Sequence, residues 1–300
     1  MAFWNYLVQQ TINAFSLGSI YALVAIGLAM VFGILRLINF AHGDLMMAAC
    51  YSAFFLITTG IGFIPTIVIT ILATMLLGIL MERVAYRPVR GAPDVIMLLT
   101  SLAVSIFLEN VFVMFLSPVP RSFRGVSPAF LDIVNHWGAV SVSNINLVTI
   151  GITVGLFVLL LLFVTRTRLG IQMRATSEDL MAAQLVGINI NAVIMTAFAI
   201  GSAMAGVAGM LWAARIGKID PLMGFIPLLK AFVAAVIGGF GDLAGAVLGS
   251  YLLGFAEIFL VGFLPPSLSS YRDAFVFVLL IILLLVRPNG ILGSTEREKV

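Results

Sequence analysis

The residues best suited to chemistry are a few polar side chains inside long apolar stretches. Glu109 and Glu257 are carboxylates within such stretches, and Asn39, His42 and Asp44 stand close together at a break in another. An unpaired carboxylate is costly to bury in a membrane, so each of these residues is a candidate for ion coupling or solute contact. The structural alternative for Glu109 and Glu257 is a place near the outer interface or a partner on another helix. Both interpretations stay open.

Other kinds of reactive site are missing. His42 and His136 are the only histidines, neither has a partner at metal-ligand spacing, and the single cysteine, Cys50, excludes a disulfide framework or a cysteine-built metal site. The three lysines are followed by isoleucine, alanine and valine, so none belongs to a GxxxxGK[ST] phosphate loop. We therefore expect no metal site, no bound cofactor and no enzyme. The remaining classes are a channel, a carrier acting alone, and the membrane part of a pump whose motor is a separate chain.

The composition indicates a polytopic membrane protein. Hydrophobic residues make up 62% of the 300 residues and charged residues 10%, with a mean hydropathy of +1.17. Soluble domains have roughly 45–50% hydrophobic residues and about 25% charged residues. At about 20 residues per crossing, the chain has room for eight or nine membrane segments. We expect an all-α bundle forming a single transmembrane domain over 1–300, and the net charge of +3 gives no reason to expect a nucleic-acid partner.

Nine apolar runs are visible along the chain, and the seventh is too short to span comfortably. Small residues recur every four positions at Ala14, Gly18 and Ala22, and again at Gly245 and Gly249, which predicts close helix packing. The runs cover about 8–34, 45–59, 61–81, 95–117, 146–165, 190–214, 226–239, 243–263 and 271–286.

Two Gly-Asp-Leu sequences, at 43–45 and 241–243, each open an apolar run, and two Arg-Pro pairs, at 87 and 287, each close one. This spacing predicts two parallel-oriented repeats, a plan found in transporters. Each aspartate can cap the helix that follows it. The functional alternative is that the broken helices line a solute path, with Asn39, His42 and Asp44 at one break. Gly239 and Asp242 would line it at the other.

The segment 166–189 is a polar connection between two apolar runs and holds five charged residues. We predict one short helix over 173–186, capped by Thr176 or Ser177, with Glu178 and Asp179 in its first turn. Small residues such as Ala182, Ala183 and Gly187 would leave a surface that another protein can approach. The helix is either a docking element for a cytoplasmic partner or an ordinary connector.

The longest polar connection, 118–145, is predicted to face outward and to hold a short interfacial helix over 130–137. If 166–189 is cytoplasmic, ten of the sixteen basic residues lie on its side, which agrees with the positive-inside rule. The C-terminus is then cytoplasmic.

Five stretches of the chain form a recognisable set, namely GILRLINFAHGD at 33–44, RATSEDLMAAQLVGIN at 174–189, FAIGSAMAGVAG at 198–209, KAFVAAVIGGFG at 230–241 and RPNGI at 287–291. Taken together, in order and over nearly the whole chain, they resemble the bacterial branched-chain amino acid ABC transporter permeases, most weakly over 118–145. The short N-terminus and the Asn-Phe-Ala-His-Gly sequence resemble the LivH-type subunit more than its longer LivM-type partner.

The resemblance implies a permease subunit of the bacterial inner membrane that pairs with a second, LivM-type permease. Two cytoplasmic ATPase subunits would hold ATP and magnesium, and a periplasmic binding protein would deliver the amino acid. The coupling helix that seats in the ATPase would lie within 174–189. Its contact residues would be Arg174, Glu178, Asp179, Ala182 and Gly187.

The function expected from this resemblance is import of leucine, isoleucine and valine by alternating access. Urea, short amides or other amino acids are alternative solutes in the same class. A carrier acting alone would be favoured if Glu109, Glu257 and Asp44 met in the membrane interior. An interaction scaffold that transports nothing is the remaining alternative.

Overall fold

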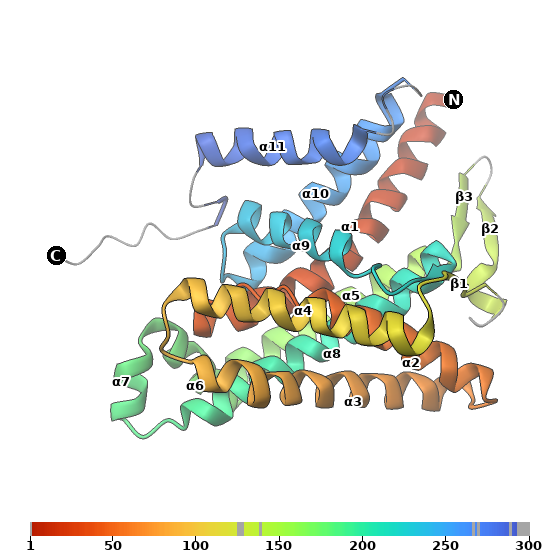
Figure 1. Cartoon of the computed structure of the whole chain (residues 1–300). Helices are drawn as coiled ribbons and strands as arrows, with labels where there is room; N and C mark the ends of the chain where they lie inside the picture. The colour runs from red at the N-terminus through yellow and green to blue at the C-terminus, as the bar shows by residue number, and fades with distance from the viewer. Residues whose placement is uncertain are drawn as a thin grey trace.

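The computed structural model describes residues 2–124, 129–137, 140–265, 268, 271–287 and 290–292. Within these residues the chain is a bundle of α-helices with short strands at one end (Figure 1). The helices are α1 (Ala2–Leu35), α2 (His42–Thr58), α3 (Phe63–Met81), α4 (Asp94–Leu116), α5 (Asn144–Arg166), α6 (Arg168–Glu178), α7 (Leu180–Leu185), α8 (Ile190–Ile216), α9 (Phe225–Gly238), α10 (Leu243–Phe263) and α11 (Arg272–Val286).

Each of the nine apolar runs forms one helix, which confirms the all-α membrane bundle. Six of the helices in the described part of the chain are long and apolar enough to cross a membrane. The helix α9 has only 14 residues, as its sequence predicts. A π-helical turn (Glu82–Tyr86) and a 3-10 turn (Arg87–Val89) extend α3 before α4 begins.

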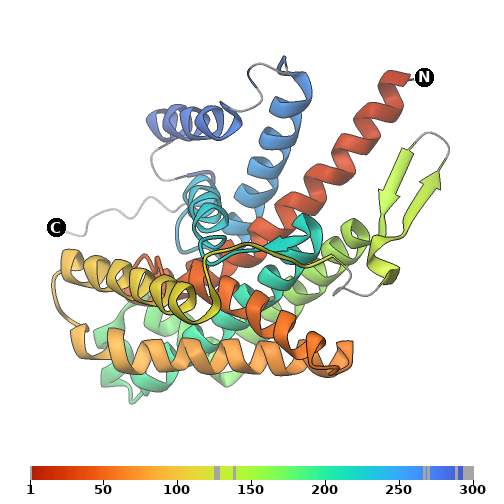
Figure 2. The same ribbon diagram turned by 45° about the vertical axis from the view of Figure 1, so that its right-hand side comes forward.

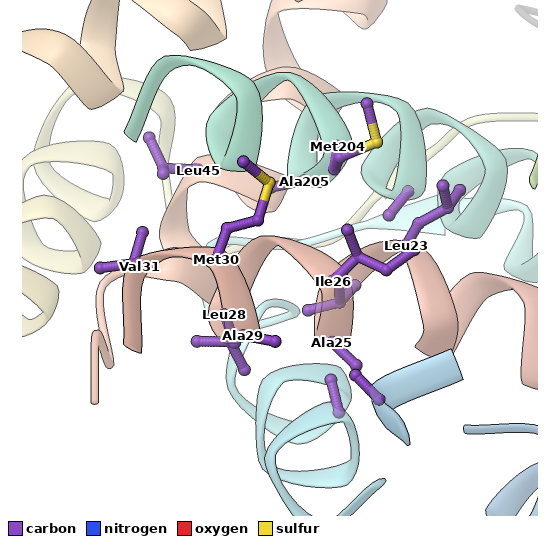
Figure 3. Close-up of a cluster of buried hydrophobic side chains, with 14 of the residues drawn as sticks. Leu23, Ala25, Ile26, Leu28, Ala29, Met30, Val31, Leu45, Met204 and Ala205 are labelled. Carbon is purple, nitrogen blue, oxygen red and sulfur yellow. The ribbon is translucent and has the colours of Figure 1, made fainter. Parts of the chain in front are cut away.

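The core forms where α1 crosses α8. Alanine, leucine, isoleucine and methionine side chains of α1 are buried against α8 and the start of α2 (Figure 3). Figure 3 shows Leu23, Ile26 and Met30 of α1 beside Met204 and Ala205 of α8. Because apolar lipid gives no hydrophobic drive for helices to associate, such contacts stabilise the bundle through close packing.

Small residues permit the closest helix crossings. A Cβ added to Gly254 of α10 would lie 2.7 Å from the Cα of Gly18 in α1, and one added to Gly249 would lie 2.0 Å from the carbonyl oxygen of Ala234 in α9. Neither space admits a side chain. The close packing predicted from the small residues around Gly18 and Gly249 is therefore confirmed.

The predicted helix at 130–137 is wrong. A 3-10 turn (Ala129–Asp132) leads into strand β2 (Val134–Trp137), which pairs antiparallel with β3 (Val140–Ser143). In β3 the buried Val140 and Val142 alternate with the polar Ser141 and Ser143, a period of two that suits a strand. A second pair joins β1 (Arg121–Ser122) to β4 (Lys218–Ile219).

The hairpin and α7 mark opposite ends of the bundle. Figures 1 and 2 both show the β2–β3 hairpin beside the N-terminal half of α1, far from α6 and α7. The backbone nitrogen of Ser141 donates to the Oε1 of Gln9 over 2.9 Å, which ties the hairpin to that half of α1. The two ends therefore present different surfaces for partners.

Candidate functional site

The segment 166–189 folds as two helices rather than the single predicted one. Thr167 caps α6 by accepting from the nitrogen of Gly170, and the chain extends at Asp179, with φ −152° and ψ 108°. Asp179 then caps α7, since its Oδ1 accepts from the nitrogen of Ala182 over 2.9 Å. The predicted caps, Thr176 and Ser177, instead bond carbonyls of α6.

The helix α7 ends just before Gly187, the glycine at which its end was predicted. Gly187 has a φ of +86°, which favours glycine, and its nitrogen donates to the carbonyl of Gln184. Asn189 follows as the cap of α8, accepting from the nitrogen of Ala192 over 3.2 Å. Caps on both sides hold a helix of only six residues, too short to persist alone in water.

All five residues predicted to contact a partner are exposed. They are Arg174, Glu178, Asp179, Ala182 and Gly187. Their role in docking stays a prediction. Ala183, which we also expected on the open surface, is instead buried and anchors α7 to the bundle.

The structure adds an apolar tip that the sequence analysis did not single out. Met181, Leu185 and Val186 are 73%, 88% and 76% exposed. They belong to the same polar connection as the exposed Arg174, Glu178 and Asp179, so a partner protein is a better explanation of their exposure than lipid. Three large apolar residues beside Glu178 and Asp179 were the available sequence signal.

Asn39, His42 and Asp44 come together around the start of α2, and all three are buried. The hydroxyl of Tyr86 donates to the Oδ1 of Asn39 over 2.6 Å, and the side chain of Asp44 bonds that of Ser105 in α4. The Nδ2 of Asn39, the Nε2 of His42 and the Oδ2 of Asp44 have no hydrogen-bond partner among the described residues. These polar atoms lie inside the bundle, but a solute path through them stays a prediction.

The two Gly-Asp-Leu aspartates have different local roles. Asp242 caps α10, since its Oδ1 accepts from the nitrogen of Gly245 over 2.7 Å, as predicted. For Asp44 the capping prediction is wrong, because α2 begins at His42 and its N-cap position is Ala41. Asp44 therefore lies within the first turn.

The second helix break packs against the last part of α1. Gly239 and Gly241 have φ values of +114° and +94°, which turn the chain between α9 and α10. The ring of Phe240 packs on that of Phe32 in the last part of α1. Gly239 and Asp242 shape this turn, and their place on a solute path stays a prediction.

The two intramembrane glutamates, Glu257 and Glu109, differ in their burial and in their partners. Glu257 is buried, accepts from the Nζ of Lys230 over 2.6 Å and accepts from the hydroxyl of Tyr21 over 2.8 Å. Lys230 also lies 2.9 Å from the Oδ1 of Asp273, an ion pair by distance that lacks hydrogen-bond geometry. Glu109 is half-buried on α4, on the side of Asp44.

The arrangement gives no support to an ion-coupling site built from all three carboxylates. Asp44 and Glu109 lie near each other, whereas Glu257 belongs to the Lys230 cluster between α1, α9 and α10. The ion pair of Glu257 was not predictable from spacing, because Lys230 lies 27 residues away on another helix.

Comparisons with known proteins agree with this architecture. The family of branched-chain amino acid transport system permease components matches residues 10–284. The chain is 40% identical over 307 residues to the high-affinity branched-chain amino acid transport system permease protein BraD of Pseudomonas aeruginosa, with 99% of each chain covered.

Two further relatives carry the name LivH. The Escherichia coli K12 permease protein LivH is 40% identical over 313 residues, with 98% of each chain covered. A probable LivH of Methanocaldococcus jannaschii is 25% identical over 283 residues, covering 92% of this chain and 89% of the relative. The chain belongs to the family of branched-chain amino acid transport system permease components.

Proposed function

We propose that this chain is one membrane-spanning subunit of an ATP-driven importer for leucine, isoleucine and valine in the bacterial inner membrane. BraD and LivH, both 40% identical over almost the whole chain, are named as high-affinity branched-chain amino acid permeases. Urea, short amides and other amino acids are less favoured solutes, because those names point to branched-chain amino acids.

The observation that carries the proposal is the apolar tip of α7 on an otherwise polar segment. A permease that hydrolyses no ATP must receive force through contact with its motor. A short capped helix with Met181 and Leu185 exposed suits insertion into a groove of another protein. Two ATPase subunits, which hold ATP and magnesium, are the partners proposed for this surface.

The segment 166–189 is proposed to face the cytoplasm, together with the C-terminus. Arg90 donates from its Nη1 to the Oδ1 of Asn191 over 2.6 Å, so the arginine-rich turn after α3 lies beside the start of α8. Arg83 and Arg87 line a pocket with Asn189 and Asn191, and α6, which carries Arg174, leads into α7 (Figure 1), so this end of the bundle is basic. Such a basic end is typical of the cytoplasmic side.

The remaining partners follow from the family. A LivM-type permease would complete the membrane pore, and a periplasmic binding protein would deliver solute at the hairpin end. Closure of the two ATPases would draw the α7 helices of the two permeases together. The bundle would then open alternately to each side.

Uptake by reconstituted liposomes tests the proposal. The complete importer, with its second permease, ATPases and binding protein, is expected to accumulate labelled leucine only when ATP is supplied to the ATPase side. This chain alone in liposomes is expected to accumulate none. Leucine uptake by the chain alone under an ion gradient would contradict the proposal and favour a carrier.

A further inference from the structure

A cavity of about 440 Å³ opens near the end of the bundle opposite α7. Side chains of α1, α8, α9 and α10 line it, including Tyr6 near the start of α1 and Arg215 near the end of α8. Small-molecule sites occupy roughly 300–1,000 Å³. The cavity therefore has room for a free amino acid, at the end where solute would arrive.

The charges around the cavity leave one cation in excess. Arg215, Lys230 and Arg272 line it with Glu257, and Asp273 adjoins it through its ion pair with Lys230. Three cations thus face two carboxylates. The excess favours a ligand with an anionic group.

Arg215 is the cation best placed to bind that group. Its Nη1 donates to the Oγ of Ser16 over 2.5 Å and to the Oδ1 of Asn146 over 3.0 Å, and both acceptors are neutral. In the part of the chain that the structure describes, no carboxylate lies within ion-pair distance of Arg215. A guanidinium has five N–H donors in a planar fork that matches a carboxylate, so it retains capacity for one.

Glu257 offers a place for a positive group. Its partner Lys230 has a second carboxylate, Asp273, at 2.9 Å. Glu257 can therefore share its charge with an incoming ammonium without leaving Lys230 unpaired. Glu257 is also the one carboxylate among the described lining residues.

Apart from Gln10 and the hydroxyls of Tyr6 and Tyr21, the rest of the lining is apolar. Trp212 of α8, Ile226 of α9, and Ile258 and Val261 of α10 face the cavity. An apolar wall beside a few charged groups is the usual plan of a site that orients a small amphipathic ligand.

We propose that this cavity binds a free aliphatic amino acid during transport. Its carboxylate pairs with Arg215, its ammonium faces Glu257, and its branched side chain lies against Trp212, Ile258 and Val261. This inference rests on the proposed function, because it assigns a site within this chain to the solute of that importer.

Direct binding tests the site. Labelled L-leucine is titrated onto the purified permease–ATPase complex without binding protein. Saturable binding is expected in the wild type, and Arg215→Gln is expected to weaken it about tenfold or more, because a charge-assisted bidentate bond is lost. Arg215→Lys should fall between the two. The control Lys218→Gln removes a cation at the same end that does not line the cavity, and should bind as wild type.

Two competing ligands distinguish the contact of the solute carboxylate from the contact of its ammonium group. Isocaproate, which keeps the carboxylate and branched chain of leucine but has no ammonium, is expected to compete. Isoamylamine, which lacks the carboxylate, is expected to compete more weakly and to be little affected by Arg215→Gln. Equal competition by both, before and after the substitution, would overturn the role of Arg215.

A second variant, which keeps every charge, tests the site independently in case Arg215→Gln fails to fold. Val261→Phe fills the cavity from its apolar wall and is expected to abolish leucine binding. Undiminished binding in Val261→Phe, or no saturable binding in the wild type, would overturn the site. If the wild-type importer still accumulates leucine, only this inference fails, whereas absence of uptake contradicts the proposed function itself.

Discussion

Glu257 and Asp44 are two of the buried carboxylates of this bundle, and their hydrogen-bond partners differ. Glu257 pairs with Lys230 and Tyr21, whereas Asp44 has the Ser105 side chain and an oxygen without a partner among the described residues. Removing one partner of a buried ion pair leaves the other charge uncompensated, and that cost usually exceeds the net stabilisation from the pair. Glu257 is therefore expected to matter for stability as well as for solute contact.

Glu257→Gln is expected to destabilise the protein by about 3 kcal/mol, the low end of the usual range, because Asp273 still pairs with Lys230. Thermal unfolding in detergent, followed by tryptophan fluorescence, measures the effect. The double variant Lys230→Met/Glu257→Gln should recover much of the loss. The control Glu109→Gln, at a half-buried site, should change stability by less than about 1 kcal/mol. Equal losses in Glu257→Gln and Glu109→Gln would contradict this interpretation.

At the scale of elements, glycine positions decide how closely the helices pack. Gly254 of α10 faces the backbone of Gly18 in α1, whereas Gly155 of α5 has nothing within 4 Å of an added Cβ. The two glycines therefore make a matched pair for testing the crossing of α1 and α10.

Gly254→Leu is expected to prevent the native crossing, because a side chain there would meet the backbone of α1. Gly155→Leu should be tolerated or slightly stabilising, since leucine favours a helix more than glycine by up to about 1 kcal/mol. The two variants are compared by their yield of monodisperse protein in size-exclusion chromatography. A Gly254→Leu variant with wild-type yield and unfolding temperature would show that the crossing is looser than described.

The second element-scale prediction concerns α7. Leu185→Asp should weaken co-purification of the ATPase subunits at least tenfold, since burial of a leucine contributes about 1.5–3 kcal/mol. Glu178→Lys should also reduce association, whereas Leu185→Met, which keeps an apolar tip, should retain it. Full co-purification of the ATPases with Leu185→Asp would place the docking surface elsewhere.

The sequence predicts the long helices well and the polar contacts poorly. The nine apolar runs form helices whose ends lie within a few residues of those expected, except that α1 begins at Ala2 rather than near residue 8, because apolar length and glycine breaks are local signals. The break at Asp179 was missed because Thr176, Ser177 and Asp179 are all residues that favour helix caps, so the sequence does not decide which of them ends one helix and begins the next. The ion pair of Lys230 with Glu257 joins separate helices, so only the packed bundle reveals it. Asp44 and Asp242 share a motif, yet helix starts three residues apart in register give them different roles.

At the scale of the whole molecule, the two ends of the bundle are proposed to have different functions. The end with α7 carries exposed apolar residues among charges and lies beside the arginine-rich turn after α3. The other end carries the hairpin and lies towards the cavity with Arg215. Solute would enter at the cavity end, and force would arrive at α7.

The side of the membrane that α7 faces is the most direct test of this account. Cys50 is fully buried, so Leu185→Cys adds an accessible thiol at a site that is 88% exposed. A membrane-impermeant maleimide should label this variant in inside-out vesicles, should fail to label it in right-side-out vesicles, and should be blocked when the ATPase subunits are bound. Labelling from the outer side, or labelling unaffected by bound ATPases, would contradict the claim that α7 is the cytoplasmic contact with the motor.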